Sequence, residues 1–178
     1  MGKTTLKDVL KAWYKTHPII FFVGLFALQI IVFYVFYFNS WFQTNVLSSV
    51  INVYASLSGK LLNLLGQQTS VSGDTISSSQ FSVGIKQGCD AAEPMALFVA
   101  GILAFPSAVK KKVYGLFIGL AILFILNLIR IISLYYIGAR YPELFDTMHL
   151  EVWQVIFIII AMALWFFWLR SGQPKLRA

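Results

Sequence analysis

Charged residues are scarce in this chain. Asp, Glu, Lys and Arg make up 12% of its 178 residues, about half the share found in soluble domains. Hydrophobic residues make up 58%, and the mean hydropathy is +0.76. This composition excludes intrinsic disorder and argues against a soluble globule, so a lipid bilayer is the expected solvent. The net charge of +7 does not indicate nucleic-acid binding, because the basic residues form short clusters beside apolar runs.

Cysteine is rare as well, since Cys89 is the only one. A single cysteine excludes an intrachain disulfide and a multi-cysteine metal site. The sequence also lacks a glycine-rich phosphate loop, a His-Glu-x-x-His helix and a Gly-x-Ser-x-Gly turn. The two histidines, His17 and His149, are expected on opposite sides of the membrane. We therefore expect no metal site and no cofactor.

Four apolar segments are long enough, or nearly so, to cross a bilayer, which takes about 20 residues. These expected spans are residues 18–38, 93–109, 113–138 and 152–169. No small-residue cleavage site follows the first run, so we expect a retained anchor rather than a removed signal peptide. The predicted fold is an all-α polytopic membrane protein with four transmembrane helices, in a single membrane domain of residues 1–178.

The region between the first two spans, residues 41–88, has a different pattern. Apolar side chains recur there every three or four positions, at Val46, Val50, Val53, Leu57, Leu61 and Leu64. This spacing predicts an amphipathic helix over residues 41–66 that lies on the surface of the membrane, at its outward-facing side. Residues 67–88 are rich in Ser, Thr, Gly and Val. They predict two short strands around a serine-rich turn, which form a small β-hairpin.

The basic residues indicate the orientation. Ten of them fall before the first span, between the second and third, or after the fourth: Lys3, Lys7, Lys11, Lys15, Lys110, Lys111, Lys112, Arg170, Lys175 and Arg177. With four spans all ten lie on one face, and the positive-inside rule places that face and both termini in the cytoplasm. Only one acidic residue, Asp8, is expected on the same side.

Three ionisable groups share the opposite, outer face. Cys89 precedes the second span, where a helix N-terminus lowers the pKa of a thiol and the neighbouring acids raise it. Arg130 lies in the third span, about 12 Å from its outer end at 1.5 Å per residue. His149 directly precedes the fourth span, and Asn127 shares the helix face of Arg130. An arginine in hydrocarbon costs about 2.5–3.5 kcal/mol, so Arg130 needs a partner, a polar cavity or a function.

Each of these residues also has a non-catalytic interpretation. A lone cysteine is often a small apolar filler, and a lone interfacial histidine is often a surface residue. Arg130 would then pair with Glu93 or Asp90, and the protein would be a non-catalytic membrane scaffold or partner-binding protein. A small transporter is a third alternative, which four spans without an internal repeat do not favour.

Thiol acyl transfer is the chemistry that suits the three groups together. The thiol of Cys89 attacks a carbonyl, the imidazole of His149 moves the proton, and Arg130 stabilises the oxyanion. Asn127 offers a further hydrogen-bond donor beside Arg130. The shared face of the three groups favours this catalytic interpretation over the scaffold.

Three short sequences around these residues resemble the exosortase and archaeosortase family. They are Gly88-Cys89-Asp90-Ala91-Ala92-Glu93, Asn127-Leu128-Ile129-Arg130-Ile131 and His149-Leu150-Glu151-Val152-Trp153-Gln154. The resemblance runs over residues 85–169, and the short chain with Phe105-Pro106 before a basic cluster is most similar to the compact exosortase H-type branch. Family members often carry a glycine two residues after the cysteine, where this chain has Ala91.

The resemblance implies a membrane cysteine protease or transpeptidase of the bacterial cytoplasmic membrane, with its active site facing outside. It implies Cys89 as nucleophile, Arg130 as oxyanion stabiliser and His149 as acid and base. The implied partners are membrane lipid and the C-terminal tails of exported proteins, each made of a short motif, a transmembrane helix and a basic cluster. The tail is cut near the motif, and the acyl group passes to water or an amine. A supporting role for Asn127 comes only from its place beside Arg130.

Overall fold

The computed structural model describes residues 16–171, so six of the basic residues that indicate the orientation lie outside it. The described part is mostly helical, as predicted. Three of its helical segments are long and apolar enough to cross a membrane: Pro18–Tyr37, Val109–Arg140 and Pro142–Arg170. The first is α2, and the second is α6. The third comprises a 3-10 turn at Pro142–Leu144, α7 (Phe145–Thr147), a π-helical turn at Met148–Val152 and α8 (Trp153–Arg170).

The second predicted span is shorter than expected. Helix α5 (Ala92–Ala104) has 13 residues, about 20 Å at 1.5 Å per residue, against a hydrocarbon core about 30 Å thick. It ends where it does because Pro106 disfavours a helical conformation at Phe105, whose ψ is 134°. The structure therefore gives three candidate spans plus this short apolar helix.

Helix α6 begins earlier than predicted. Lys110, Lys111 and Lys112 form its first turn instead of a loop. Lys111 Nζ donates to the carbonyl of Leu169 at 3.1 Å, and Trp168 Nε1 donates to the carbonyl of Lys111 at 3.0 Å. This reciprocal pair ties the start of α6 to the end of α8.

The predicted amphipathic helix is present, and besides the predicted apolar stripe it has a second apolar face that packs inside the protein. It runs through α3 (Ser40–Phe42), a π-helical turn at Gln43–Leu47 and α4 (Ser48–Leu64). The buried face of α4 carries Ile51, Tyr54, Ala55 and Leu62, whereas Val50, Val53, Leu61 and Leu64 of the predicted stripe are exposed. The small residues Ala55, Ser58 and Gly59 explain the choice, because they let α4 pack closely on its neighbours.

The predicted hairpin is part of a three-stranded antiparallel sheet. Its strands are β1 (Ser70–Ser72), β2 (Thr75–Ser77) and β3 (Ser82–Gly84), in the order β1-β2-β3. The serine-rich turn joins β2 to β3 as expected. The extra strand arises because Gly73, with a φ of +58°, forms a tight turn that folds Val71 back against Ile76.

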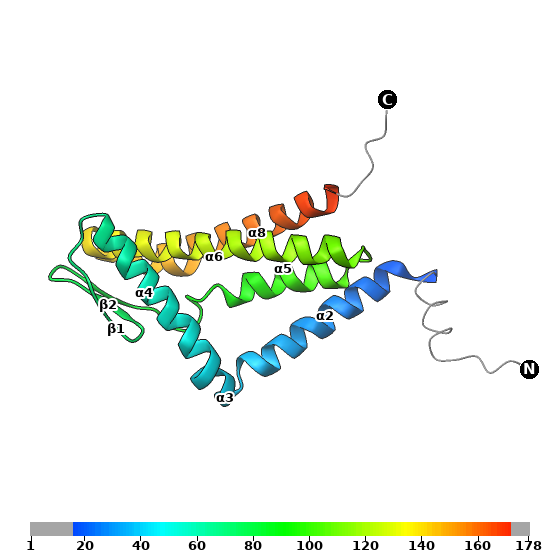
Figure 1. The fold of residues 1–178 in the computed structure, drawn as a ribbon, viewed down its shortest axis with the longest axis horizontal. Helices are drawn as coiled ribbons and strands as arrows, with labels where there is room; N and C mark the ends of the chain where they lie inside the picture. The colour runs from blue at the N-terminus through cyan, green and yellow to red at the C-terminus, as the bar shows by residue number, and fades with distance from the viewer. Residues whose placement is uncertain (1–15, 172–178) are drawn as a thin grey trace, which may run out of the picture.

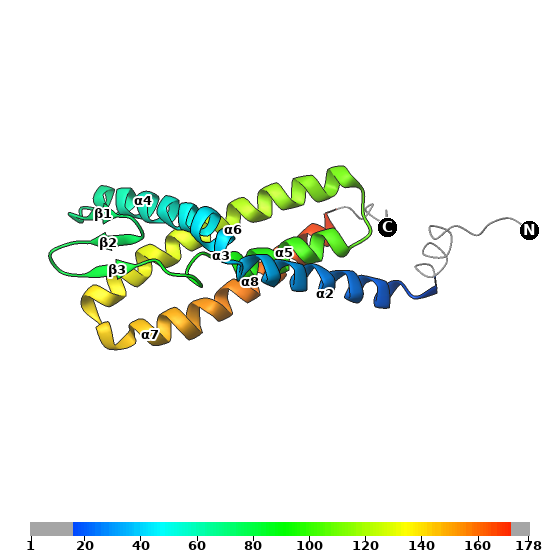
Figure 2. The same ribbon diagram turned by 90° about the horizontal axis from the view of Figure 1, so that it is seen from below.

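Two apolar clusters hold these elements together. The strand-side cluster joins α4, the sheet and the distal half of α6, through residues such as Tyr54, Ile76 and Tyr135. The α5–α8 cluster joins α5, α6 and α8, through residues such as Phe98 and Phe157. Figure 1 shows α5, α6 and α8 side by side, with α4 crossing obliquely, and Figure 2 shows the strands at the end opposite the start of α2 and the end of α8. The loop before α5 connects the two clusters, because Cys89 packs on the first and Ala91 belongs to the second.

Candidate active site

Cys89, Arg130 and His149 come together between the two clusters. The Sγ atom of Cys89 lies 3.4 Å from Nε2 and 3.8 Å from Nδ1 of His149. Nη2 of Arg130 lies 3.4 Å from Nδ1 of His149 and donates to the carbonyl of the same residue at 3.2 Å. The three side chains come from the loop before α5, from α6 and from the π-helical turn before α8. The sequence predicts only a shared face for them, and the structure brings them into contact.

Arg130 is buried without a carboxylate partner. It is 3% exposed, and the only ion pair within residues 16–171 joins Lys86 to Asp74. Nη1 donates to the carbonyl of Gly88 at 3.3 Å, and Nε has no partner among the described residues. The pairing with Glu93 or Asp90 on which the scaffold interpretation depends is therefore not observed. Asp90 attracts the guanidinium electrostatically but forms no ion pair with it, and burying a charge outside an ion pair is costly, which favours a functional role for Arg130.

Asn127 holds the main chain of the loop that carries Cys89. It is fully buried, and its Nδ2 donates to the carbonyl of Cys89 at 2.9 Å. Together with the bond from Arg130 to Gly88, this anchors two successive carbonyls of the loop to α6. Asn127 thus supports the position of the thiol instead of pointing a free donor at it.

Two tyrosines of α2 complete the surroundings, and the sequence analysis missed them. Tyr37 donates to Oδ2 of the buried Asp90 at 2.9 Å, and Tyr34 donates to Oε1 of Glu93 at 3.2 Å. Oδ1 of Asp90 accepts from the amide of Ala92 at 2.9 Å. The sequence offers only a partial signal, because Tyr34 and Tyr37 stand three residues apart, the spacing of one helix face.

His149 is oriented by Arg130 and by an aromatic ring. Phe145, one turn earlier, stacks on the imidazole with a centroid distance of 5.7 Å and an interplanar angle of 15°. The ring of Phe145 in turn lies 5.9 Å from that of Phe81, in the turn between β2 and β3. The sheet thus packs against the imidazole through these two rings.

Burial raises the pKa of the Cys89 thiol. A hydrogen bond with the backbone of Lys86 and the positive charge of Arg130 both act to lower it, but burial has the larger effect. The helix effect expected from the sequence does not prevail, because regular helix begins only at Ala92. A raised pKa favours the protonated thiol at neutral pH, and the ring nitrogen nearest to the sulfur is Nε2 of His149 at 3.4 Å.

Ala91 has a left-handed backbone, with φ +57° and ψ 19°. This conformation costs a residue with a Cβ about 1–2 kcal/mol. We expect Ala91→Gly to raise the free energy of unfolding by about 0.5–1 kcal/mol, since glycine adopts it freely but loses more chain entropy. Thermal unfolding in detergent checks this. The control Ala96→Gly, inside α5, should instead lower stability by about 1 kcal/mol, and equal effects of the two changes would contradict the assignment of strain.

The fold and the site define a class of protein: a membrane protein with a thiol, an imidazole and an unpaired guanidinium in contact. The comparison with protein families identifies it further, since residues 19–167 match the model of the transmembrane exosortase. The chain therefore belongs to the transmembrane exosortase family, as the resemblance in sequence predicts. No curated protein and no solved structure gave a match. The family is generally one of cysteine transpeptidases, which act on exported proteins with C-terminal tails.

Proposed function

We propose that this protein is a membrane cysteine protease or transpeptidase that cleaves the C-terminal tails of exported proteins. The observation that carries the proposal is the contact of the only cysteine with His149, which in turn contacts a buried, unpaired Arg130. Membership of the family supports exported proteins as the substrates. In this proposal Cys89 is the nucleophile, His149 the acid and base, and Arg130 the oxyanion stabiliser.

Proton transfer to His149 requires Arg130 to change its hydrogen bond. Nε2 of neutral His149 can accept the thiol proton only when Nδ1 carries the other proton. Arg130 has donors only, so its contact with Nδ1 at 3.4 Å competes with that tautomer. We propose that the substrate carbonyl draws the Nη2 donor of Arg130 away from Nδ1. Binding of the substrate then prepares the oxyanion donor and the base in one movement.

The chemical steps follow from this arrangement. The thiol proton passes to Nε2 of His149, and the sulfur forms a bond to the carbonyl carbon of the scissile peptide. Arg130 stabilises the negative charge on the carbonyl oxygen. The carbon–nitrogen bond then breaks, and His149 returns the proton to the leaving amine. The resulting thioester on Cys89 is transferred to water or to an acceptor amine, with His149 again accepting the proton.

We also propose that α5 provides a fourth crossing, so that both termini are cytoplasmic and the site faces outward from a bacterial cytoplasmic membrane. The start of α6 with its three lysines and the end of α8 with Arg170 lie at one end of the molecule (Figure 1). Helix α5 begins three residues after Cys89 and leads to that end. In this proposal the site therefore lies toward the membrane face away from these basic residues. The positive-inside rule then supports a cytoplasmic basic end.

C-terminal peptide mass spectrometry tests the proposed function and needs no identified substrate. Membrane and secreted proteins are compared between native-host cells that carry the wild type or Cys89→Ala at equal abundance. We expect a set of proteins that keep an apolar, basic-ended tail only in the mutant cells. Identical C-termini in both strains would overturn the proposal.

The raised pKa of Cys89 predicts how its reactivity depends on pH. Below its pKa the thiolate fraction rises tenfold per pH unit, so alkylation of the purified protein by iodoacetamide should rise by about that factor per unit between pH 7 and 9. Because the chain has one cysteine, the label reports this site alone. A plateau near neutral pH would instead indicate a resting thiolate.

A further inference from the structure

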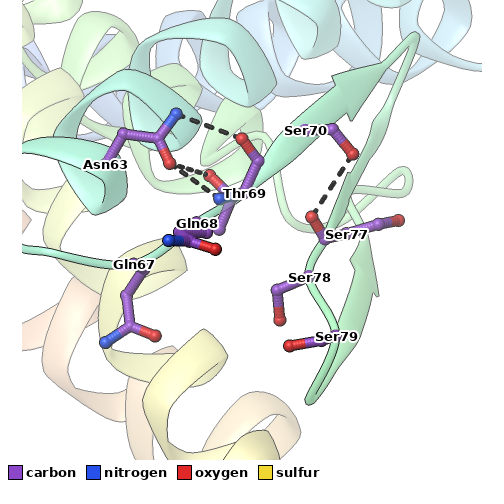
Figure 3. Close-up of a pocket in the computed structure, with 8 residues that line it drawn as sticks. All are labelled: Asn63, Gln67, Gln68, Thr69, Ser70, Ser77, Ser78 and Ser79. Carbon is purple, nitrogen blue, oxygen red and sulfur yellow. Dashed lines mark hydrogen bonds between the residues drawn. The ribbon is translucent and has the colours of Figure 1, made fainter.

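An open polar cleft of about 640 Å³ lies between the end of α4 and the sheet (Figure 3). Its eight lining side chains are four serines, two glutamines, an asparagine and a threonine. All of them are uncharged, and all carry hydrogen-bonding groups. Such a lining suits a ligand that is itself uncharged and rich in donors and acceptors, as an extended peptide is.

Hydrogen bonds fix both walls of the cleft. On one wall, Oδ1 of Asn63 accepts from the amide and hydroxyl of Thr69 at 2.7 and 2.9 Å. On the other, Oγ of Ser78 accepts from the hydroxyl of the buried Tyr135 at 2.7 Å and from the amide of Phe81 at 3.2 Å. The cleft is thus formed before any ligand arrives, which lowers the cost of binding.

The groups between the walls are left available. Within the described residues, the side chains of Gln67, Gln68 and Ser79 make no hydrogen bond. Figure 3 shows the polar ends of Gln68 and Ser79 extending toward the space between the walls. These donors and acceptors can therefore serve a ligand without breaking an internal bond.

The cleft is connected to the candidate active site. The turn that supplies Ser78 and Ser79 also carries Phe81, whose ring packs on Phe145 at 5.9 Å, and Phe145 stacks on His149. Gly138 of α6 admits the Phe81 ring, because a Cβ at this position would overlap it. Gly138 is eight residues beyond Arg130, about 12 Å along the helix. About four extended residues, at about 3.3–3.6 Å each, cover this distance.

We propose that the cleft binds the substrate segment on the N-terminal side of the scissile bond, through hydrogen bonds to uncharged backbone and side-chain groups. This inference rests on the proposed function. The strands lie at the end of the molecule away from the described basic clusters (Figure 1). From the thiol, the tail helix of the substrate runs toward those clusters, and the exported part runs toward the cleft. The cleft therefore selects the part that stays on Cys89 as the acyl group.

A bulky side chain in the cleft tests this assignment. Ser79→Trp should increase at least tenfold the uncleaved fraction of those proteins whose tails Cys89→Ala cells retain. Alkylation of Cys89 by N-ethylmaleimide should keep its wild-type rate, which shows that the fold and the thiol are intact. Ser49 is exposed near the start of α4, and the matched control Ser49→Trp should cleave the same proteins at the wild-type rate. Processing of the same proteins by Ser79→Trp at the wild-type rate would overturn the inference and leave the proposed function standing.

A photo-cross-linker gives a second, independent measurement. Benzoylphenylalanine is placed at Gln68 in the Cys89→Ala protein, which retains uncut substrate. We expect cross-linked peptides within about six residues on the N-terminal side of the junction that the wild type cuts, a reach set by about 3.3–3.6 Å per extended residue. Cross-links confined to the tail helix would overturn the assignment. If Cys89→Ala cells retain no tails at all, the proposed function fails first, and this inference fails with it.

Discussion

Replacing Cys89 by alanine is expected to lower the rate of tail cleavage by at least about a thousandfold, because no other thiol can form the acyl-enzyme. The change removes one atom from a site whose main chain is held by Asn127 and Arg130. The protein should therefore accumulate to wild-type levels. Cleavage is measured on a retained-tail protein, purified from the mutant cells and added to membranes that contain either enzyme.

Trapping the thioester separates the chemistry from the binding of the substrate. Hydroxylamine attacks thioesters, so the wild type should release the cleaved substrate as a hydroxamate, and Cys89→Ala should release none. Cys89→Ser is the matched control for size, and its weaker nucleophile should also leave little product. Cleavage by Cys89→Ala at even a tenth of the wild-type rate would remove the thiol from the mechanism.

Replacing Arg130 by lysine is expected to lower cleavage by about 10²–10³-fold, the loss seen when one oxyanion donor is removed. Lysine keeps the charge, but it is a compact ammonium without the planar fork of a guanidinium. In the structure that fork reaches the carbonyl of Gly88 with one nitrogen and both Nδ1 and the carbonyl of His149 with the other. A single ammonium cannot keep these positions and also meet the substrate oxygen. Full activity of Arg130→Lys would contradict the proposed role.

Stability separates a catalytic Arg130 from a structural one. Arg130→Met removes the donor to the carbonyls of Gly88 and His149, but it also removes the cost of burying a cation that forms no ion pair among the described residues, so the two effects on stability oppose each other. Arg130→Met should therefore unfold in detergent within a few degrees of the wild type, although its activity is lost. A scaffold with a structural arginine predicts the reverse, namely a large fall in the unfolding temperature. The matched Cys89→Ala protein provides the inactive but fully packed reference.

The local structure near Cys89 decides between the two opposing effects on its acidity that the sequence leaves open. The spacing of apolar residues indicates a helix after the cysteine, and α5 is there. However, Asp90 and Ala91 form a turn first, with the carboxylate of Asp90 held by Tyr37 and by the amide of Ala92. That turn displaces the helix start from the thiol, and burial then dominates its pKa. The bond from Tyr37 comes from a distant helix, and no local pattern reveals it.

The stripe on α4 illustrates a second limit. Both faces of this helix carry apolar residues, so periodicity alone does not choose which one packs on the sheet and α6. Close approach decided it, because Gly59 leaves no room for a Cβ against Val71 and the neighbouring small residues share that face. The predicted stripe, with Val50, Val53 and Leu61, has larger side chains that would prevent such close packing, and it stays exposed.

By itself, the sequence determined the membrane class, the helical content, the serine-rich turn, and the family signalled by the residues around Cys89, Arg130 and His149. These properties depend on hydropathy and on short local patterns, which can be read from the sequence without knowledge of long-range contacts. Only the tertiary structure decided that His149 contacts both Cys89 and Arg130, and that Arg130 forms no ion pair with a carboxylate of residues 16–171. These depend on contacts between residues up to 60 positions apart, such as that between Cys89 and His149, and a contact of that range is set by packing.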